Sequence, residues 1–279
     1  MTVNGVTGPS KLQRLLDSLR FKARYSPFKY ISVDDGEYRY SFRCETLLEV
    51  WRAMTLLTKE EGTVQWIRSQ VNVGNVFYDI GANIGLYTLL AGKRVGEEGM
   101  VYAFEPHVAN VCSLLHNVSC NGLNRSVKVM SCALNDKEGF FDFNYNSWVS
   151  GSSMSQLNDN RDDSGREFQP VCSEFKFATT IDKLIINGVI KPPTHIKIDV
   201  DGNELLVLKG MQELMSSKTR PAFIQVEINP RNKDTVYQFM LEREFALHEK
   251  HYTLNGKQAI ANGRSPEDVT AYNAIFSPK

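Results

Sequence analysis

Several features that would mark other classes of protein are missing from the sequence. The five cysteines form no C-x-x-C pair and their number is odd, so a disulfide framework is not indicated. No apolar run approaches the roughly 18 residues of a membrane-spanning helix, and the first residues lack the apolar segment of a secretory signal. Neither sign of charge is in excess, because Lys plus Arg and Asp plus Glu each number 32.

These absences narrow the classes of function. Free thiols fit a reducing compartment, so we expect a cytoplasmic protein without a transmembrane segment. A chain of zero net charge has no field that would concentrate a polyanion, which disfavours nucleic acid as a partner. With 279 residues and 42% hydrophobic content, the chain can bury one large core. We therefore expect one catalytic domain with an extension.

The extension is expected over residues 1–74. Within residues 11–24, four leucines share one helical face and are surrounded by lysines and arginines, which indicates a basic amphipathic helix. This helix either docks on the main domain or contacts a membrane surface or a partner. A strand over residues 37–42, a helix over residues 46–57 and a further helix, opened by a T-x-x-E capping box at Thr58, are expected to follow.

From residue 75 to residue 279 the sequence alternates apolar strands with amphipathic helices. This pattern is typical of a mostly parallel, doubly wound α/β sheet covered on both faces. The expected strands span residues 76–80, 100–105, 127–134, 195–200 and 222–228, and helices begin near Ile84, His107, Asn203 and Asn232. Two closing strands, residues 245–248 and 272–277, are expected to pair antiparallel at one edge and complete a Rossmann-like sheet of seven strands.

One long segment interrupts this alternation. Residues 144–175 are polar and rich in Ser, Asn and Asp. Connections of this length are usually lids, binding loops or disordered segments. We interpret the segment as a mobile loop that contacts the substrate, and plain disorder is the alternative.

A glycine turn and an acidic residue follow the first two strands. In an open α/β sheet, ligands bind beyond the carboxyl ends of the strands. The first strand ends in DIGANIG, in which Gly81 and Gly85 let the backbone approach a ligand. Asp79 precedes both glycines, and Asn83 lies between them. This spacing differs from the G-x-G-x-x-G that holds a pyrophosphate. Glu105 ends the second strand, where its carboxylate can accept hydrogen bonds from both ribose hydroxyls. The two features together predict an adenosine-type ligand.

The later strand ends carry more candidates. Ala133, in the segment SCALND that ends the third strand, is expected near the adenine. Asp199 ends the fourth strand and should lie beside the glycine turn, which makes it the first candidate for chemistry. Asp201 and Glu204 follow it, and their spacing also fits a helix capping box. Glu227 ends the fifth strand, with catalysis and structural support as equal alternatives.

Ordered segments of the chain resemble a known family. DIGANIGLYTLLA, VYAFEPHVAN, LLHNVSCNGL, CALNDKEG, TTIDKL, IKIDVDGNELLVLKG and IQVEI occur within residues 76–228. In this order and spacing they resemble the FkbM family of S-adenosylmethionine-dependent methyltransferases. The resemblance implies a class I methyltransferase fold and, usually, O-methylation of a hydroxyl on a sugar, glycan or natural-product scaffold. The chain departs from the family at Asp201, where the longer Glu is usual.

Methyl transfer from a sulfonium is an in-line displacement, so alignment of the reacting atoms is the main task of the protein. We expect Asp199 to act as base or orienting acceptor for an alcohol, with Glu227 or Glu204 as a second carboxylate. If Mg²⁺ takes part, Asp199, Asp201 and Glu204 would supply the hard oxygen ligands that suit it. The residues expected to bind S-adenosyl-L-methionine are Asp79, Gly81, Asn83, Gly85, Glu105, Ala133 and Asp199.

Other functions stay open at this point. A methyltransferase acting on nitrogen or on nucleic acid would share the cofactor half, but those acting on exocyclic amines commonly carry [DN]-P-P-[YF] after the fourth strand, where this chain has DVDG. A scaffold that binds the cofactor without catalysis is another alternative, although Gly81, Gly85 and Glu105 are all present. The sequence predicts a small-molecule or carbohydrate acceptor and leaves a homo-oligomer open.

Overall fold

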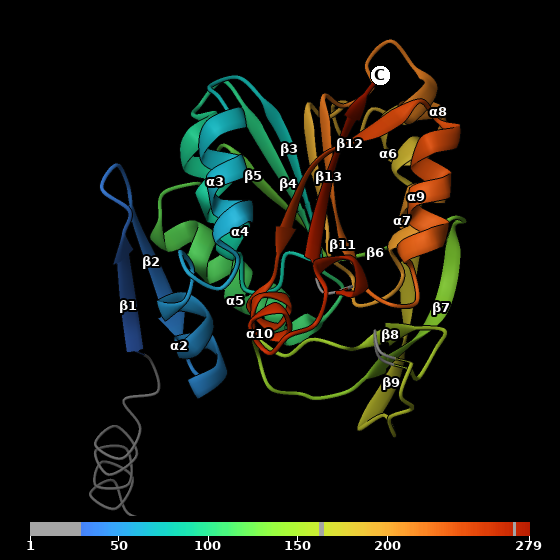
Figure 1. Ribbon diagram of the computed structural model, residues 1–279. Coiled ribbons are helices and arrows are strands. Elements are labelled where there is room, and N and C mark those ends of the chain that lie inside the picture. The colour runs from blue at the N-terminus through green and yellow to red at the C-terminus, as the bar shows by residue number, and fades with distance from the viewer. Residues whose placement is uncertain (1–28, 162–164, 270–271) are drawn as a thin grey trace, which may run out of the picture.

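The computed structural model describes residues 29–161, 165–269 and 272–279 (Figure 1). The amphipathic helix expected over residues 11–24 lies outside these ranges. No helix within the described part of the chain is long and apolar enough to cross a membrane.

A seven-stranded sheet forms the centre of the molecule, with the strand order β12-β13-β11-β10-β3-β4-β5. The five strands from β11 to β5 run parallel, whereas β13 is antiparallel to both of its neighbours. This is the doubly wound class I methyltransferase fold predicted from the sequence, with the antiparallel strand second from the edge. The strands are β3 (Val76–Ile80), β4 (Met100–Phe104), β5 (Val127–Met130), β10 (His195–Ile198), β11 (Phe223–Ile228), β12 (Phe245–Tyr252) and β13 (Tyr272–Pro278).

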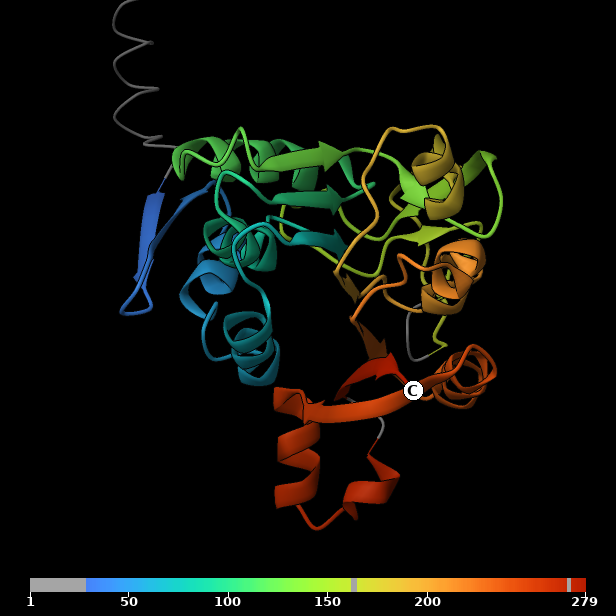
Figure 2. The ribbon, with the colours of Figure 1, turned by 90° about the horizontal axis from the view of Figure 1, so that it is seen from above.

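Helices cover both faces of this sheet (Figures 1 and 2). Successive residues of β3 point to opposite faces, so Phe77 belongs to one apolar core and Tyr78 to the other. The first core is closed by α3 (Glu61–Gln70), α4 (Leu86–Val95) and α5 (Val108–Cys120). The second is closed by α6 (Ile181–Ile186), α7 (Glu204–Lys209), α8 (Gln212–Ser216) and α9 (Lys233–Glu242). Between β12 and β13 lie α10 (Leu254–Ala261) and the 3-10 turn η1 (Pro266–Asp268).

A hairpin and a helix at the start of the described chain contribute to the first core. The strand predicted over residues 37–42 is present as β2 (Arg39–Cys44), and it pairs antiparallel with β1 (Lys29–Asp34). The hairpin stands at the outer side of α2 (Leu47–Met54) and α5 in Figure 1. Residues 29–54 are therefore folded against the sheet domain.

The capping box lies at a different helix from the one predicted. Thr46 accepts a hydrogen bond from the Glu49 N–H, and the Glu49 side chain accepts one from the Thr46 N–H, so the reciprocal cap opens α2. The box predicted at Thr58 is wrong, because α3 begins after Glu60, which makes no side-chain cap hydrogen bond. Both sites have the T-x-x-E spacing. Thr46 has the extended backbone of an N-cap, whereas Thr58 lies within the turn between α2 and α3.

The segment predicted as a loop over residues 144–175 is strand at both ends. A second sheet has the order β6-β9-β7-β8, formed by β6 (Ala133–Leu134), β7 (Gly139–Tyr145), β8 (Gln156–Leu157) and β9 (Cys172–Thr179). Buried Phe143 and Tyr145 alternate with more exposed residues in β7. Phe140 of β7 and Phe175 of β9 are exposed, so apolar residues occur on both faces of these strands and mask the alternation in the sequence. The third predicted strand, residues 127–134, is likewise divided between the two sheets as β5 and β6.

Candidate functional site

A cleft of about 380 Å³ opens beyond the carboxyl ends of the central strands. Its strand-end wall includes Gly81, Glu105, Asp199 and Glu227. Its N-terminal wall includes Trp51, Arg52 and Lys59, from α2 and the turn before α3. Segments far apart in the sequence thus meet around one cavity.

Gly81 forms the floor of the cleft where the first strand ends. Its φ is +81°, and a Cβ at this position would lie 1.8 Å from the Asp199 carbonyl oxygen, so only glycine fits. Its N–H donates to the Phe104 carbonyl at 2.9 Å. Gly85 has φ +95° and a Cβ there would meet Leu114 at 2.6 Å, so this glycine serves the packing of α4 on α5.

Glu105 is buried at the end of β4 and lines the cleft. Its carboxylate accepts hydrogen bonds from the N–H groups of Asn83 at 2.7 Å and His107 at 2.9 Å. Burial outweighs these bonds and raises the pKa of Glu105 to about 7. Asp79, by contrast, lies behind the turn, where it accepts a hydrogen bond from the Thr88 hydroxyl.

A small apolar pocket of about 50 Å³ adjoins the cleft. Gly81 and Phe143 line both cavities, so the two are continuous. Ala133 and Leu134 line the small pocket, and Phe104 forms part of its wall. A flat, largely apolar ring would fit between these side chains.

Residues 150–156 form a strap across the cleft. The Ser152 carbonyl accepts hydrogen bonds from the side-chain amides of Asn83 at 2.8 Å and Asn110 at 3.1 Å. At the other end, the Met154 N–H donates to the Asp201 carboxylate at 2.6 Å. The strap therefore ties the Glu105 side of the cleft to the turn after β10.

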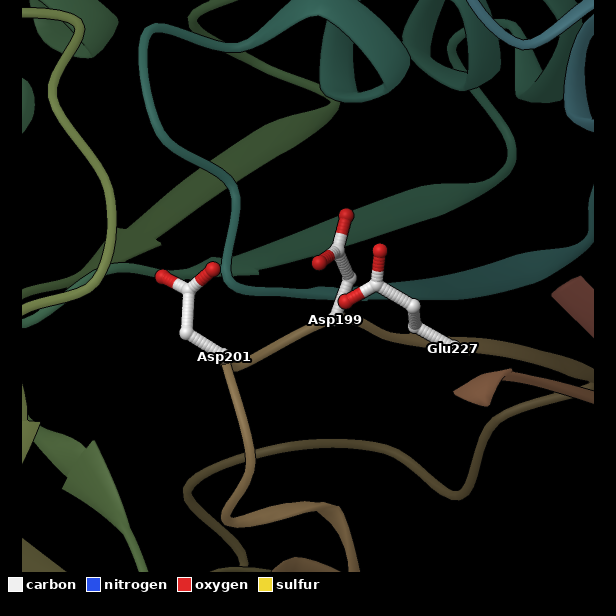
Figure 3. A group of neighbouring side chains, drawn as sticks. All are labelled: Asp199, Asp201 and Glu227. Atoms are coloured by element: carbon white, nitrogen blue, oxygen red, sulfur yellow. The ribbon is translucent and has the colours of Figure 1, made fainter. Parts of the chain in front are cut away.

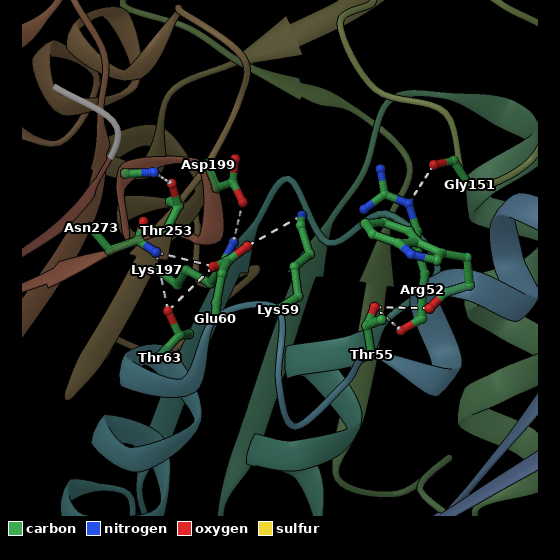
Figure 4. A network of polar contacts seen from close by, with 12 residues as sticks. Arg52, Thr55, Lys59, Glu60, Thr63, Gly151, Lys197, Asp199, Thr253 and Asn273 are labelled. Carbon is green, nitrogen blue, oxygen red and sulfur yellow. Dashed lines mark hydrogen bonds and ion pairs between the residues drawn. The ribbon is translucent and has the colours of Figure 1, made fainter. Parts of the chain in front are cut away.

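Asp199 is paired with a buried lysine. The Lys197 ammonium lies 2.9 Å from the Asp199 carboxylate, and its side chain is 1% exposed (Figure 4). Burial opposes ionisation of Asp199, but the charges of Lys197 and Lys59 and a hydrogen bond from Glu227 outweigh it and lower the pKa of Asp199 to about 2. Lys197 also lies over the Tyr87 ring, 5.1 Å from its centroid.

Glu227 is the second carboxyl group of the strand-end wall. Figure 3 shows its side chain beside that of Asp199, with Asp201 farther along the same turn. Burial and the negative charge of Asp199 raise the pKa of Glu227 well above its ordinary value. The opposite directions of the two shifts mean that Glu227 binds a proton more readily than Asp199.

Glu204 does not line the cleft. Its buried carboxylate accepts hydrogen bonds from the N–H groups of Val200 at 3.1 Å and Gly202 at 3.0 Å, and from the Asn232 side chain at 2.8 Å. These bonds fix the turn after β10. The carboxylates whose oxygens lie within 4.8 Å of one another are Asp199, Asp201 and Glu227, so the predicted metal set is not brought together at Glu204.

The capping box predicted for Asp201 and Glu204 is also wrong. Asn203 occupies the N-cap of α7 and makes no side-chain cap hydrogen bond. Asp201 has a φ of +56° and binds the strap. Asp201 therefore binds the strap and does not cap α7.

Four side chains of the site were not predicted from the sequence: Trp51, Arg52, Lys59 and Lys197. Lys197 had a visible signal, since a lysine in the middle of the apolar strand HIKI must be buried or bent away. The N-terminal residues had none, because no spacing relates them to the strand ends.

Comparison with known proteins gives a family match that includes the strand-end residues. The sequence model of the methyltransferase FkbM domain matches residues 79–253, more than half of the chain. The chain belongs to the FkbM methyltransferase family. The family's match begins at Asp79 and includes the glycine turn and every strand-end candidate, whereas the N-terminal wall lies before it.

Relatives of this FkbM methyltransferase are distant. Hexuronic acid methyltransferase AglP from Haloferax volcanii is 25% identical over 222 residues, which cover 78% of this chain and 82% of AglP. The FkbM methyltransferase structure from Methylobacillus flagellatus is 18% identical with a TM-score of 0.46, and the alignment covers 72% of this chain and 43% of that one. M. jannaschii TYW2, in complex with AdoMet, is 11% identical with a TM-score of 0.45, at 91% and 87% coverage.

Proposed function

We propose that this FkbM methyltransferase uses S-adenosylmethionine to methylate a hydroxyl group on a sugar, glycan or similar small acceptor. The observation that carries the proposal is the ionised Asp199, held by Lys197 in the same cleft as Gly81 and Glu105. An alcohol is a poor nucleophile at neutral pH, and a carboxylate within reach can orient it and accept its proton.

The residues of the cleft fit the cofactor. Gly81 lets the turn after β3 pack against the Asp199 carbonyl while it lines the cleft, Glu105 offers its carboxylate to ribose hydroxyls, and the pocket at Ala133 suits an adenine ring. When bound, S-adenosylmethionine supplies an electrophilic methyl group. In this arrangement the strand-end wall binds the nucleoside and keeps Asp199 at the reacting end.

Asp199 and its neighbours would handle the acceptor's proton. With a pKa of about 2, Asp199 is a weak base, so it orients the hydroxyl and receives the proton only as the new O–C bond forms. Lys197 holds the carboxylate in one place through its ion pair. Glu227 donates a hydrogen bond that fixes the other side of Asp199.

Magnesium does not fit this cluster. The Lys197 ammonium, 2.9 Å from Asp199, already supplies the positive charge there and would repel a divalent cation. The raised pKa of Glu227 favours its protonated form, and a metal ligand would have to lose that proton. The proposed transfer therefore needs no metal ion.

The name of AglP supports a sugar acceptor, at a sequence identity of 25%. Residues before 75 complete the cleft with Trp51, Arg52 and Lys59, which supports treating them as an extension that contributes to acceptor binding.

Two measurements test the proposal. Calorimetric titration with S-adenosylhomocysteine should show binding, and labelled S-adenosylmethionine should yield a methyl ether on members of a panel of sugars and glycosides. Binding without transfer to any acceptor would favour a silent scaffold. Transfer to RNA, DNA or an amine in preference to the hydroxylated panel would favour the nitrogen-directed alternative.

A further inference from the structure

Arg52 presents the open edge of its guanidinium group to the cleft. Its Nε donates a hydrogen bond to the Gly151 carbonyl of the strap (Figure 4). Its two terminal nitrogens have no hydrogen-bond or ion-pair partner among the residues that the structure describes. The bond through Nε fixes the plane of the group, and two parallel N–H donors on a fixed plane are the arrangement that binds a carboxylate in a bidentate manner.

Nearby charges leave the Arg52 charge available. Glu49, one turn earlier on α2, already accepts four hydrogen bonds, from Ser113, Ser150 and two backbone N–H groups. Lys59, the other cation of the N-terminal wall, lies 3.3 Å from the Glu60 carboxylate and is balanced by it. The uncompensated charge on this wall is therefore that of Arg52.

Trp51 adds an apolar surface to the same wall. Its side chain lines the cleft although it is 46% exposed. A half-exposed indole beside an arginine offers a face for the C–H groups of a sugar ring. The strand-end wall is different, because the ionised Asp199 there repels an anion.

The cleft thus has a positive charge at Arg52 on one wall and a negative charge at Asp199 on the other. From this arrangement we infer that the acceptor carries a carboxylate, as a uronic acid does, which binds Arg52 while a ring hydroxyl faces Asp199. The inference rests on the proposed function and names the substrate class of the same site. The carboxylate is a handle for binding, and the hydroxyl is the nucleophile.

Matched glycosides test the inference. The probes are pairs of 4-nitrophenyl glycosides that differ only at C6, with a carboxylate or a hydroxymethyl group, in the gluco, galacto and manno configurations. We expect kcat/KM for at least one uronide to exceed that of its neutral partner by about tenfold, as for a bidentate charged contact. Arg52→Gln should reduce this ratio to near one, and Arg52→Lys should restore part of it.

The control variant is Arg125→Gln. Arg125 is exposed in the turn before β5, at the amino ends of the strands, and does not line the cleft. The Arg125→Gln variant should leave kcat/KM unchanged for both glycosides of each pair. Equal loss on uronide and neutral glycoside in Arg52→Gln would mean that Arg52 only anchors the strap, and would overturn the inference.

Other outcomes separate this inference from the proposed function. If the wild type methylates neutral glycosides as well as uronides, the inference fails and the proposed function stands. If Arg52→Gln weakens S-adenosylhomocysteine binding by tenfold or more, Arg52 holds the cofactor's carboxylate instead. A product that mild alkali cleaves, a methyl ester, would place the carboxylate at Asp199 and also overturn the inference. If no pair is methylated although S-adenosylhomocysteine binds, both fail.

Discussion

The two walls of the cleft differ in how firmly their charged groups are held. On the strand-end wall, Lys197 is 1% exposed and ion-paired, and Glu105 is 5% exposed with both oxygens hydrogen-bonded. On the N-terminal wall, Trp51 is 46% exposed and the Lys59 side chain 31% exposed. The family match includes the first wall and excludes the second. From this difference we propose that the sheet fixes the chemistry, whereas the N-terminal wall selects the acceptor.

The largest effect is expected at Asp199. Asp199→Asn removes the acceptor for the hydroxyl proton, so kcat should fall by about 10²–10³-fold. Affinity for S-adenosylhomocysteine should change much less, which calorimetry can check. The matched variant is Glu227→Gln, which imitates the protonated carboxyl and should retain most of the activity. Equal losses in the two variants would contradict the assignment of the proton to Glu227.

Lys197→Met should change the pH dependence of turnover. In the wild type the pKa of Asp199 is about 2, so Asp199 stays ionised at every pH at which the rate is measured. Without the Lys197 charge, burial raises the pKa of Asp199, and an acid limb should enter the kcat profile, with a larger loss at pH 5 than at pH 8.

Lys128→Met, at an exposed position on β5, is the control for the Lys197 variant. A uniform loss at all pH values in Lys197→Met would show that Lys197 only supports the fold. A shifted acid limb cannot arise from misfolding alone, so this readout separates the electrostatic role from the structural one.

Cofactor affinity should depend on Glu105 and on pH. With a pKa of about 7, Glu105 is protonated at pH 6 and ionised at pH 8. Only the ionised form offers both oxygens to ribose hydroxyls, so affinity for S-adenosylhomocysteine should rise as pH increases through 7. Glu105→Gln should weaken binding by about tenfold at pH 8 and flatten the profile. An unchanged dissociation constant at pH 8 would remove Glu105 from the ribose site.

The strand-end wall could be predicted from the sequence because its signals are local. Apolar strands followed at once by Gly81, Glu105, Asp199 and Glu227 place these residues at one sheet edge. The environment of each residue could not be predicted. Glu204 stands three residues after Asp201, yet one is saturated by backbone N–H groups and the other binds the strap, and only the three-dimensional path of the chain separates them.

The N-terminal wall and the strap could not be predicted for a different reason. Arg52 meets Gly151 across 99 positions of sequence, and no motif marks either of them. Strand β7 was hidden because the exposed Phe140 stands next to Phe141, so that apolar and polar residues do not alternate along the strand. Such contacts depend on packing between segments, which periodicity along the chain does not report.

The smallest expected effect tests how the N-terminal wall is held. The Thr46 side chain accepts from the Glu49 N–H at 3.1 Å and donates to the Ser150 carbonyl at 2.9 Å, so it caps α2 and ties it to the strap. Thr46→Ala should lower the free energy of unfolding by about 1 kcal/mol, measured by denaturant titration.

Thr55→Ala, at the other end of α2, is the matched control, since its hydroxyl bonds only to carbonyls of its own helix. It should cost less stability than Thr46→Ala and leave KM unchanged. In Thr46→Ala, KM for the acceptor should rise severalfold while the S-adenosylhomocysteine affinity stays constant, because Trp51 and Arg52 move with α2 and the strand-end wall does not. If both the KM for the acceptor and the dissociation constant for S-adenosylhomocysteine rose, the two walls would bind one ligand together. The proposed separation of acceptor binding from cofactor binding would then be wrong.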